Sequence, residues 1–220
     1  MLICIENIIG TGMLATLREK IAAAPELFVD GASTAGWHAK AVKNNEQGQG
    51  DLAKRIDAIV EEKLHANPLF KAAAQPKAII KTLVSRYQPG MSYGTHLDEP
   101  MMAGSRVDLS FTLFLNGPET YDGGALIIEN TEGEASYKLA AGSLVLYPTT
   151  ALHRVEEVTK GERLVVVGWV RSFIRSAANR EVIFDLENLI ASLRKSEADR
   201  AVIDRALKVK ANLMQQWADD

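Results

Sequence analysis

The chain has few of the features that place a protein outside the cell or in a membrane. Cys4 is the single cysteine among 220 residues, so an internal disulfide is impossible and a reducing compartment suits the chain. No uninterrupted apolar run approaches the roughly 18 residues that a transmembrane helix requires. The first residues also lack the basic and apolar stretches of a signal peptide. We therefore expect a cytoplasmic protein with no membrane partner.

The chain also lacks an excess of basic residues. Its net charge of −3 and its pI near 5.9 give no electrostatic reason to expect nucleic acid as a partner. Hydrophobic residues make up 47% and charged residues 24%, a balance typical of a globular protein with a sizeable core. The length suits one domain, or one domain with a helical appendage.

Hydrophobic periodicity divides the chain into three regions. Residues 1–75 are predicted to form a mostly helical N-terminal layer, including a helix over about 47–66. Residues 76–173 alternate with period two between glycine turns, which indicates a jelly-roll core. Residues 177–220 return to helical spacing and predict a C-terminal helical extension. The predicted fold class is therefore α+β.

The strand predictions are specific. One face of 106–116 is predicted to be apolar because every second residue is hydrophobic: Val107, Leu109, Phe111, Leu113 and Leu115. The other predicted strands cover 2–5, 79–87, 125–129, 136–139, 143–147, 153–158 and 164–170.

The C-terminal helical region carries two apolar stripes. One contains Leu189, and the other contains Val202 and Trp217. Apolar stripes on helices bury themselves against another surface. We expect these stripes to pack on the barrel or on a second subunit, so a homo-oligomer is a possible partner arrangement.

His96-Leu97-Asp98, followed in the same β region by His153, has the composition of a metal site. Two histidines and one carboxylate can occupy one face of an iron(II) ion and leave the opposite face open. Residues two apart on a strand point the same way, so His96 and Asp98 at a strand end would enter the barrel together. Taken alone, such a triplet is also common in solvated turns, so the residues leave both interpretations open.

The other histidines and three further polar residues of the chain each have an interpretation of their own. His65 ends a helix, where it can cap backbone carbonyls, and His38 is interpreted as a surface residue or a hydrogen bonder. Arg163 begins an apolar strand, where a guanidinium group meets a carboxylate or stays in water at the strand mouth. Tyr87 and Tyr93 are candidate hydrogen bonders, although many strand tyrosines only pack.

Several ordered segments make the match to one family specific. They read SRYQPGMSYGTHLDEPMM, RVDLSFTLFLN, YDGGALIIE and AAGSLVLYPTTALHRVEEVTKGERLVVVGWVRS. In these segments the chain resembles the bacterial PKHD-type hydroxylases, the prolyl/lysyl-hydroxylase-domain members of the Fe(II)- and 2-oxoglutarate-dependent dioxygenase superfamily. The resemblance extends to DGASTAGWHAKAVKNNEQ upstream and FDLENLI downstream, and so covers most of the chain.

The resemblance implies a double-stranded β-helix with a defined set of ligands. It implies that His96, Asp98 and His153 bind iron. It also implies that Arg163 holds the distal carboxylate of 2-oxoglutarate, with Tyr87 as a second cosubstrate residue. The expected activity is hydroxylation by O2, coupled to decarboxylation of 2-oxoglutarate to succinate and CO2, with ascorbate keeping the iron reduced.

One position departs from the family pattern. Phe114 stands where some relatives have a tyrosine, so the hydrogen bond of that tyrosine must come from Tyr87, Thr112 or water. The substrate stays open at this point: a protein, a peptide or a small molecule connected with iron uptake. Trp37 and Asn44-Asn45 are expected to line the substrate side.

Three other functions are compatible with parts of the sequence. A non-catalytic iron- or oxygen-sensing barrel would use the same ligands, but it needs no arginine for a cosubstrate. A zinc hydrolase would require a general base, for which Glu99 is the nearby candidate. A helical interaction module would depend on the C-terminal helices. The segment 99–104 is either a lid over the site or an ordinary connection.

Overall fold

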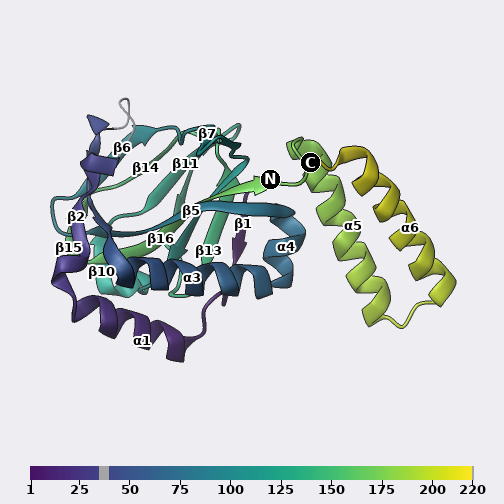
Figure 1. Cartoon of the computed structure of the whole chain (residues 1–220), viewed down its shortest axis with the longest axis horizontal. Helices are drawn as coiled ribbons and strands as arrows, with labels where there is room; N and C mark the ends of the chain where they lie inside the picture. The colour runs from purple at the N-terminus through teal and green to yellow at the C-terminus, as the bar shows by residue number, and fades with distance from the viewer. Residues whose placement is uncertain (35–39, 220) are drawn as a thin grey trace.

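The computed structural model describes residues 1–34 and 40–219 (Figure 1). It confirms the predicted α+β jelly-roll with helices packed on it. Trp37 and His38 lie outside the described residues. The described strands are β1 (Ile3–Ile5), β2 (Phe28–Asp30), β3 (Lys43–Asn44), β4 (Glu46–Gly48), β5 (Pro76–Tyr87), β6 (Ser92–His96), β7 (Met101–Met102), β8 (Ser105–Arg106), β9 (Leu109–Phe114), β10 (Tyr121–Gly123), β11 (Leu126–Asn130), β12 (Gly133–Tyr137), β13 (Leu144–Pro148), β14 (His153–Val155), β15 (Val158–Gly161) and β16 (Arg163–Ser172). The described helices are α1 (Thr11–Ala22), α3 (Gly50–Ala66), α4 (Pro68–Ala74), α5 (Ala177–Lys195) and α6 (Arg200–Trp217). Within these ranges, no helix is long and apolar enough to cross a membrane.

Two antiparallel sheets face each other and form the barrel. The major sheet has the strand order β1-β13-β9-β16-β5-β4-β2, and the minor sheet has the order β12-β11-β14-β6-β3. Non-consecutive strands are neighbours throughout, as expected for a jelly-roll. Helices α1 and α3 run beneath the major sheet in Figure 1 and cover its outer face.

Alternation along the major sheet separates a helix-packing face from a pocket face. In β9, the predicted apolar residues Leu109, Phe111 and Leu113 do lie in the cluster that packs against the helices. The residues between them face the barrel interior, where Phe114 packs with side chains of the minor sheet. Each fully buried aliphatic or aromatic side chain of this kind contributes about 1.5–3 kcal/mol to folding. The strand is therefore held from one side and is available for chemistry on the other.

The N-terminal region contains more strand than its hydrophobic pattern predicts. The helix expected from residue 47 begins at Gly50, because Gln47 belongs to β4 and pairs with Ser85 of β5. Strands β2, β3 and β4 are too short to carry a clear period of two, so sequence periodicity missed them. They extend the two sheets and close one side of the barrel.

Several predicted strands have different bounds in the structure. The strand predicted over 106–116 is divided into β8 and β9, and the strand predicted over 153–158 is divided into β14 and β15. The strand predicted over 136–139 begins earlier, at Gly133, because β12 forms a tight hairpin with β11. The strand β6 has no counterpart among the predicted strand ranges, although a strand end was considered for His96 and Asp98. It ends at His96, and Asp98 lies two residues beyond it.

The two C-terminal helices form a hairpin that projects away from the barrel (Figure 1). Leu189 is 52% exposed and Val202 is 50% exposed, whereas Ile190 of the first stripe is 2% exposed, so the chain itself covers only part of the two predicted stripes. The hairpin is fastened where its ends meet the barrel. There the Arg106 guanidinium donates a 2.6 Å hydrogen bond to Asp219, and Ile174 forms a β-bridge with Ala218.

The Asp57 carboxyl group on α3 is partly buried where the helix packs on the major sheet, and the cost of this burial can be measured. Burial raises the pKa of its carboxyl group to about 6, and its Oδ1 atom is buried without a partner among the described residues. A raised carboxyl pKa means that the charged form is disfavoured in the folded state, so stability is lost as the pH rises through about 6. We expect Asp57→Asn to raise the free energy of unfolding by about 1 kcal/mol at pH 8 and to leave it unchanged at pH 4.

Urea unfolding at the two pH values measures this difference. Glu62→Gln is the matched control, because Glu62 is 70% exposed on the same helix. Its effect is expected to stay within about 0.5 kcal/mol at both pH values. A gain for Asp57→Asn that is equal at pH 4 and pH 8 would contradict the argument.

Candidate metal centre and its pocket

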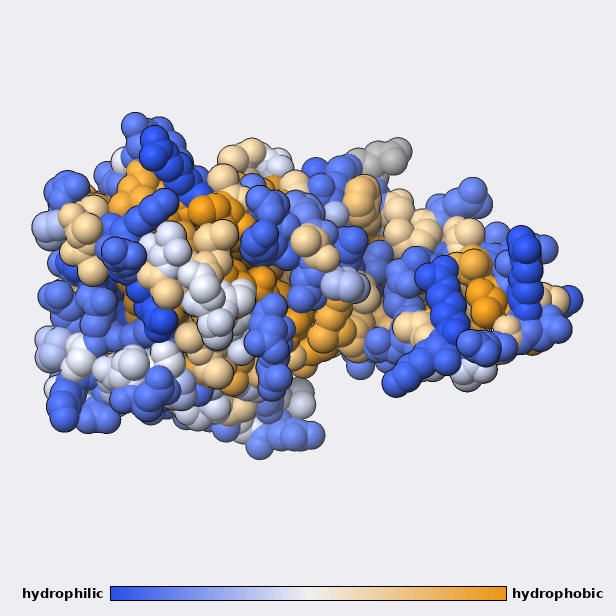
Figure 2. All heavy atoms as spheres, turned by 90° about the horizontal axis from the view of Figure 1, so that it is seen from below, coloured by the Kyte–Doolittle hydropathy of each residue, from blue (hydrophilic) through white to orange (hydrophobic). Residues whose placement is uncertain are grey.

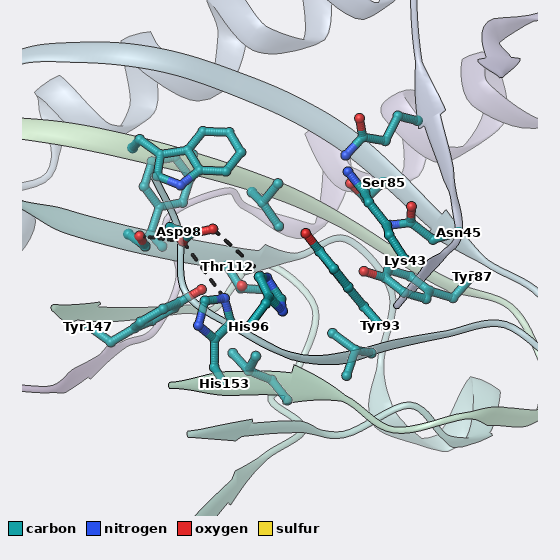
Figure 3. Close-up of a pocket in the computed structure, with 18 of the residues that line it drawn as sticks. Lys43, Asn45, Ser85, Tyr87, Tyr93, His96, Asp98, Thr112, Tyr147 and His153 are labelled. Atoms are coloured by element: carbon teal, nitrogen blue, oxygen red, sulfur yellow. Dashed lines mark hydrogen bonds and ion pairs between the residues drawn. The ribbon is translucent and has the colours of Figure 1, made fainter. Parts of the chain in front are cut away.

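Pairing of β6 with β14 brings the two candidate histidines together. His96, the last residue of β6, is the register partner of His153, the first residue of β14. Asp98 follows β6 by two residues and lies across both rings, with its carboxylate oxygens 4.0 Å from His96 Nε2 and 3.7 Å from His153 Nε2. One ligand atom of each residue lies within 4.8 Å of the others (Figure 3). Three donors at this separation can share one metal ion.

Hydrogen bonds orient both imidazole rings toward a common point. His96 Nδ1 lies 2.8 Å from the carbonyl oxygen of Gly94, and His153 Nδ1 lies 3.0 Å from that of Ala151. A carbonyl oxygen only accepts, so each Nδ1 carries the proton and each Nε2 keeps its lone pair. This tautomer is the one a metal ion needs.

Burial adds to the effect of these hydrogen bonds at His96. The side chain is 3% exposed. Burial, and then the neighbouring His153 ring, lowers the pKa of His96 to about 4. The imidazole is therefore neutral at physiological pH, which leaves its Nε2 lone pair free for a metal ion.

A hydroxyl pair holds the carboxylate of Asp98. Ser110 Oγ donates a 2.7 Å hydrogen bond to Asp98 Oδ2, and the Thr149 hydroxyl lies 3.2 Å from Ser110 Oγ. Ser110 and Thr149 are each 1% exposed. Because water does not compete for these buried groups, the carboxylate is fixed in direction before any ligand arrives.

Arg163 lies in the pocket beside these ligands and is almost fully buried. It is 1% exposed, and among the described residues its Nε and Nη1 atoms have no hydrogen-bond partner. Its guanidinium carbon lies 4.9 Å from the ring centroid of Tyr87 and 5.5 Å from that of Phe114. The alternative in which Arg163 stays in water is therefore wrong. A buried cation with free donors calls for an anionic ligand in the pocket.

The Gly123-Gly124 turn makes room for this arginine. Gly124 adopts a positive φ of 63°, and a Cβ atom at this residue would lie 3.1 Å from Arg163 Cδ and 2.8 Å from Val158 Cγ2. A side chain here would therefore force Arg163 or Val158 to move. The glycine pair does more than form the turn expected from the sequence.

The structure also assigns places to the remaining sequence candidates. Tyr87 is 3% exposed and lines the same pocket as Arg163. The Tyr93 ring stacks on His96, with centroids 3.6 Å apart and planes inclined by 15°. His65 and Glu99 are exposed and lie outside the described lining of this pocket.

Sequence reasoning missed several residues of the pocket. Ser110, Tyr147 and Trp169 line it from the major sheet, and Lys43 lines it from β3. Burial lowers the pKa of Lys43 to about 8, so it is still largely protonated at pH 7. The sequence did contain a signal for these residues. Ser110 and Thr112 alternate with the apolar residues of one strand, and buried polar residues on one face mark the face that is turned toward a site.

Comparison with known sequences gives consistent matches. A profile of the 2OG-Fe(II) oxygenase superfamily matches residues 82–171. A protein of Parvibaculum lavamentivorans named PKHD-type hydroxylase is 50% identical over 223 residues, with all of both chains covered. A protein of Acaryochloris marina with the same type name is 48% identical over 221 residues, again with full coverage of both chains.

Solved structures share the fold at low sequence identity. A Pseudomonas putida prolyl-4-hydroxylase matches with a TM-score of 0.57 and 21% identity, covering 78% of this chain and 92% of that one. A Trichoplax adhaerens prolyl hydroxylase, solved with a hypoxia inducible factor peptide fragment, matches with a TM-score of 0.58 and 15% identity, covering 77% and 83%. These likenesses concern the arrangement of strands and helices.

Replacement of Ser110, one of the two hydroxyl residues that hold Asp98, tests whether this carboxylate binds the metal ion. Ser110→Ala removes the donor to Asp98 Oδ2 and leaves the three candidate ligands in place. Groups that orient a metal ligand typically contribute 10–100-fold to affinity, so we expect Co(II) binding to weaken by about that factor. Calorimetric titration of the purified variant measures the change.

Ser85→Ala is the matched control for this variant. Ser85 is also 1% exposed and lines the same pocket, but it belongs to β5 and is not one of the two hydroxyl residues that hold Asp98. Its Co(II) affinity is expected to equal that of the unmodified protein. Equal affinities for Ser110→Ala and the unmodified protein would show that the hydroxyl does not position Asp98.

Proposed function

The chain belongs to the PKHD-type hydroxylases of the 2OG-Fe(II) oxygenase superfamily, and on this premise we propose that His96, Asp98 and His153 hold its Fe(II) ion. It is an Fe(II)- and 2-oxoglutarate-dependent dioxygenase that acts on O2 and an organic substrate. We further propose that Arg163 binds the distal carboxylate of 2-oxoglutarate and that Tyr87 assists it.

The observation that carries these assignments is the pairing of a metal-ligand set with a buried, unsatisfied arginine in one pocket. Two neutral imidazoles and a carboxylate suit Fe(II) and leave positions for further ligands. The free Nε and Nη1 donors of Arg163 suit a carboxylate, which accepts two parallel hydrogen bonds from a guanidinium group. A structural ion pair would have supplied that carboxylate from the protein itself.

When bound, Fe(II) and 2-oxoglutarate supply the oxidising chemistry, in which the cosubstrate gives succinate and CO2 and the substrate gains a hydroxyl group. The residues of the chain bind and orient these ligands, and they exclude water from the pocket. Ser110 directs Asp98, and the backbone carbonyls of β6 and the turn before β14 direct the imidazoles. Phe114, Val145 and Val165 supply an apolar interior that keeps water away from the reacting groups.

Because Phe114 cannot donate the hydrogen bond of the tyrosine that some relatives have, a neighbouring residue must donate it. Tyr87 lies at the Arg163 end of the pocket, where β5 pairs with the start of β16. Tyr147 is 3% exposed, and its ring meets that of His153 edge-on at 5.1 Å. Burial, with the nearby Asp98 carboxylate, raises the pKa of Tyr147 well above 10, so its hydroxyl keeps the proton and can donate it.

The same residues argue against two of the three alternative functions, the zinc hydrolase and the iron- or oxygen-sensing barrel. A zinc hydrolase needs a general base beside the metal ion, but Glu99 is exposed and lies outside the described lining of the pocket. A sensor that only binds iron has no use for the buried charge of Arg163. The cosubstrate accounts for that charge directly.

Succinate release from 2-oxoglutarate tests the assignments. Arg163→Met is expected to raise the KM for 2-oxoglutarate by at least about 100-fold, because it removes a buried two-pronged ionic hydrogen bond. His96→Ala is expected to abolish both Fe(II) binding and oxygen-dependent succinate formation. The assay is run in air and without oxygen, with ascorbate present to keep the iron reduced.

Arg154→Met is the control for the arginine variant. Arg154 is the residue after His153, but it lies at the surface and pairs with Glu134. We expect its KM to be unchanged. Unaltered 2-oxoglutarate kinetics in Arg163→Met would reject the cosubstrate role of Arg163.

We also propose a role for each region of the chain. Residues 76–173 would form the dioxygenase core, residues 1–75 a supporting helical layer and residues 177–220 an extension that joins two copies. Val182, Leu189, Val202 and Val209 support the last part, because each is at least 46% exposed on the hairpin. Figure 2 shows apolar surface between hydrophilic side chains on this narrow part of the molecule. Exposed apolar patches of this kind mark interaction sites.

Sedimentation equilibrium tests the joining of two copies. The unmodified protein is expected to have twice the mass of one chain, and the double variant Leu189→Glu/Val202→Glu the mass of one. Met13→Glu is the control, since Met13 is an exposed apolar residue on α1 (38% exposed) and its replacement is expected to leave the mass unchanged. A single-chain mass for the unmodified protein would refute the proposal.

A further inference from the structure

The segment that follows Asp98 has few interactions of its own to hold it in place. Strands β7 and β8 form a separate two-stranded sheet, and their turn contains Ala103 and Gly104 with positive φ angles of 49° and 74°. A two-stranded hairpin is marginally stable alone, and a positive φ is unfavourable for alanine. Met101 and both turn residues are exposed. The position of this hairpin therefore depends on the contacts at its base.

The base of the hairpin is joined to the candidate metal ligand along the backbone. Pro100 lies two residues after Asp98, and its carbonyl oxygen accepts a 2.9 Å hydrogen bond from the N–H group of Val107. Val107 is 5% exposed and stands between Arg106 and Asp108. Whatever fixes these two neighbours therefore also fixes the backbone that carries Asp98.

Arg106 fastens this base with all three nitrogen atoms of its guanidinium group. The Nε atom donates a 2.8 Å hydrogen bond to Asp108 Oδ1, and the Nη2 atom donates a 3.2 Å hydrogen bond to the carbonyl oxygen of Ser172. The Nη1 atom donates the 2.6 Å hydrogen bond to Asp219 Oδ2. These acceptors lie just before β9, at the end of β16 and near the C-terminus. A planar guanidinium group suits such a joint because its donors have fixed directions.

Asp108 provides a second connection to the metal ligand, through side chains. Its carboxylate is 5% exposed and accepts a 2.8 Å hydrogen bond from the N–H group of Ser172. Its backbone carbonyl oxygen accepts a 3.2 Å hydrogen bond from the N–H group of Thr149. The Thr149 hydroxyl lies beside Ser110 Oγ, which donates to Asp98 Oδ2. The backbone connection and the side-chain connection therefore end at the same carboxylate.

The C-terminal segment that supplies Asp219 is itself anchored to the barrel. The N–H group of Asp219 donates a 2.7 Å hydrogen bond to the carbonyl oxygen of Phe173. The carbonyl oxygen of Asp219 accepts a 3.3 Å hydrogen bond from Lys77 Nζ of β5. Figure 1 shows the end of the chain where the α5–α6 hairpin meets the barrel. The Asp219 carboxylate is therefore held at a fixed place beside Arg106.

We propose that Arg106 and Asp219 are positioning residues of the metal centre. Asp219 holds Arg106, and Arg106 holds residues 98–108 so that Asp98 faces the two imidazoles. The C-terminal extension thereby contributes to metal binding, although its two helices project away from the barrel (Figure 1). This inference rests on the proposed function, because it takes Asp98 as a ligand of the Fe(II) ion.

Amide hydrogen exchange of the metal-free protein tests the fastening itself. Arg106→Gln removes the charged joint, so peptides over residues 99–107 are expected to exchange about tenfold faster, while β5 and β11 exchange as in the unmodified protein. Asp219→Asn is a milder variant that leaves Arg106 and Asp108 paired. Because Asp219 is 43% exposed, we expect it to accelerate the same peptides about threefold.

Calorimetric titration with Co(II) tests whether the fastening reaches Asp98. Groups that orient a metal ligand typically contribute 10–100-fold to affinity. Arg106→Gln is therefore expected to weaken Co(II) binding about tenfold, and Asp219→Asn about threefold. The visible absorption spectrum of bound Co(II) depends on the ligands and their geometry, so it is expected to change in both variants.

Glu187→Gln is the matched control, because it also replaces an acid of the C-terminal extension by its amide. Glu187 of α5 pairs with Lys210 of α6, so the variant removes an ion pair within the helical hairpin and leaves Arg106 and Asp219 unchanged. We expect the exchange of residues 99–107, the Co(II) affinity and the spectrum to equal those of the unmodified protein.

Three results would overturn this inference alone. One is unchanged exchange of residues 99–107 in Arg106→Gln, or faster exchange in every strand, which would show a general loss of folding. The second is an unaltered Co(II) affinity and spectrum in both variants. The third is an equal loss of Co(II) affinity in Glu187→Gln and Asp219→Asn. Failure of the unmodified protein to bind Co(II) would instead refute the ligand assignments of the proposed function, and this inference with them.

Discussion

The antiparallel pairing of His96 with His153 is the constraint on which the site depends. It joins a strand end from the middle of the chain to a strand start far along it, and so places two imidazoles side by side. Their Nδ1 atoms are engaged by carbonyl oxygens two residues back, which turns both Nε2 atoms toward Asp98. A one-residue slip in this register would turn one ring to the opposite face of the minor sheet, and the three donors would no longer meet.

The alternation of the major sheet gives this site its surroundings. Outward-facing residues of β9 and β16 fill the core beneath α1 and α3, so the strands are fixed without using their inner faces. The inner faces are then free to carry Ser110, Arg163 and Trp169. The core fixes the backbone, and the backbone fixes the positions of polar groups that contribute little to folding themselves. One face of these strands therefore stabilises the fold, and the other face carries the residues of the pocket.

Charge organises the interior as strongly as shape does. Arg163 is nearly inaccessible to water yet lacks partners for two of its nitrogen atoms, which is unfavourable in a protein with no ligand. The indole nitrogen of Trp169, which lines the same pocket, is likewise buried without a hydrogen-bond partner among the described residues. The proposed binding of 2-oxoglutarate at Arg163 would supply acceptors for the free donors of that arginine.

The sequence by itself determined the family, the jelly-roll class and the residue types of the site, because period-two strands, glycine turns and the spaced histidines are local or ordered features of the chain. It did not determine the short strands β3, β4 and β6, whose few residues carry no clear period. Only the tertiary structure decided that Ser110 supports Asp98, that Gly124 makes room for Arg163, and that Leu189 and Val202 lie exposed on a projecting hairpin. Each of these depends on contacts between residues far apart in the chain, and periodicity along a single segment contains no information about its distant partners.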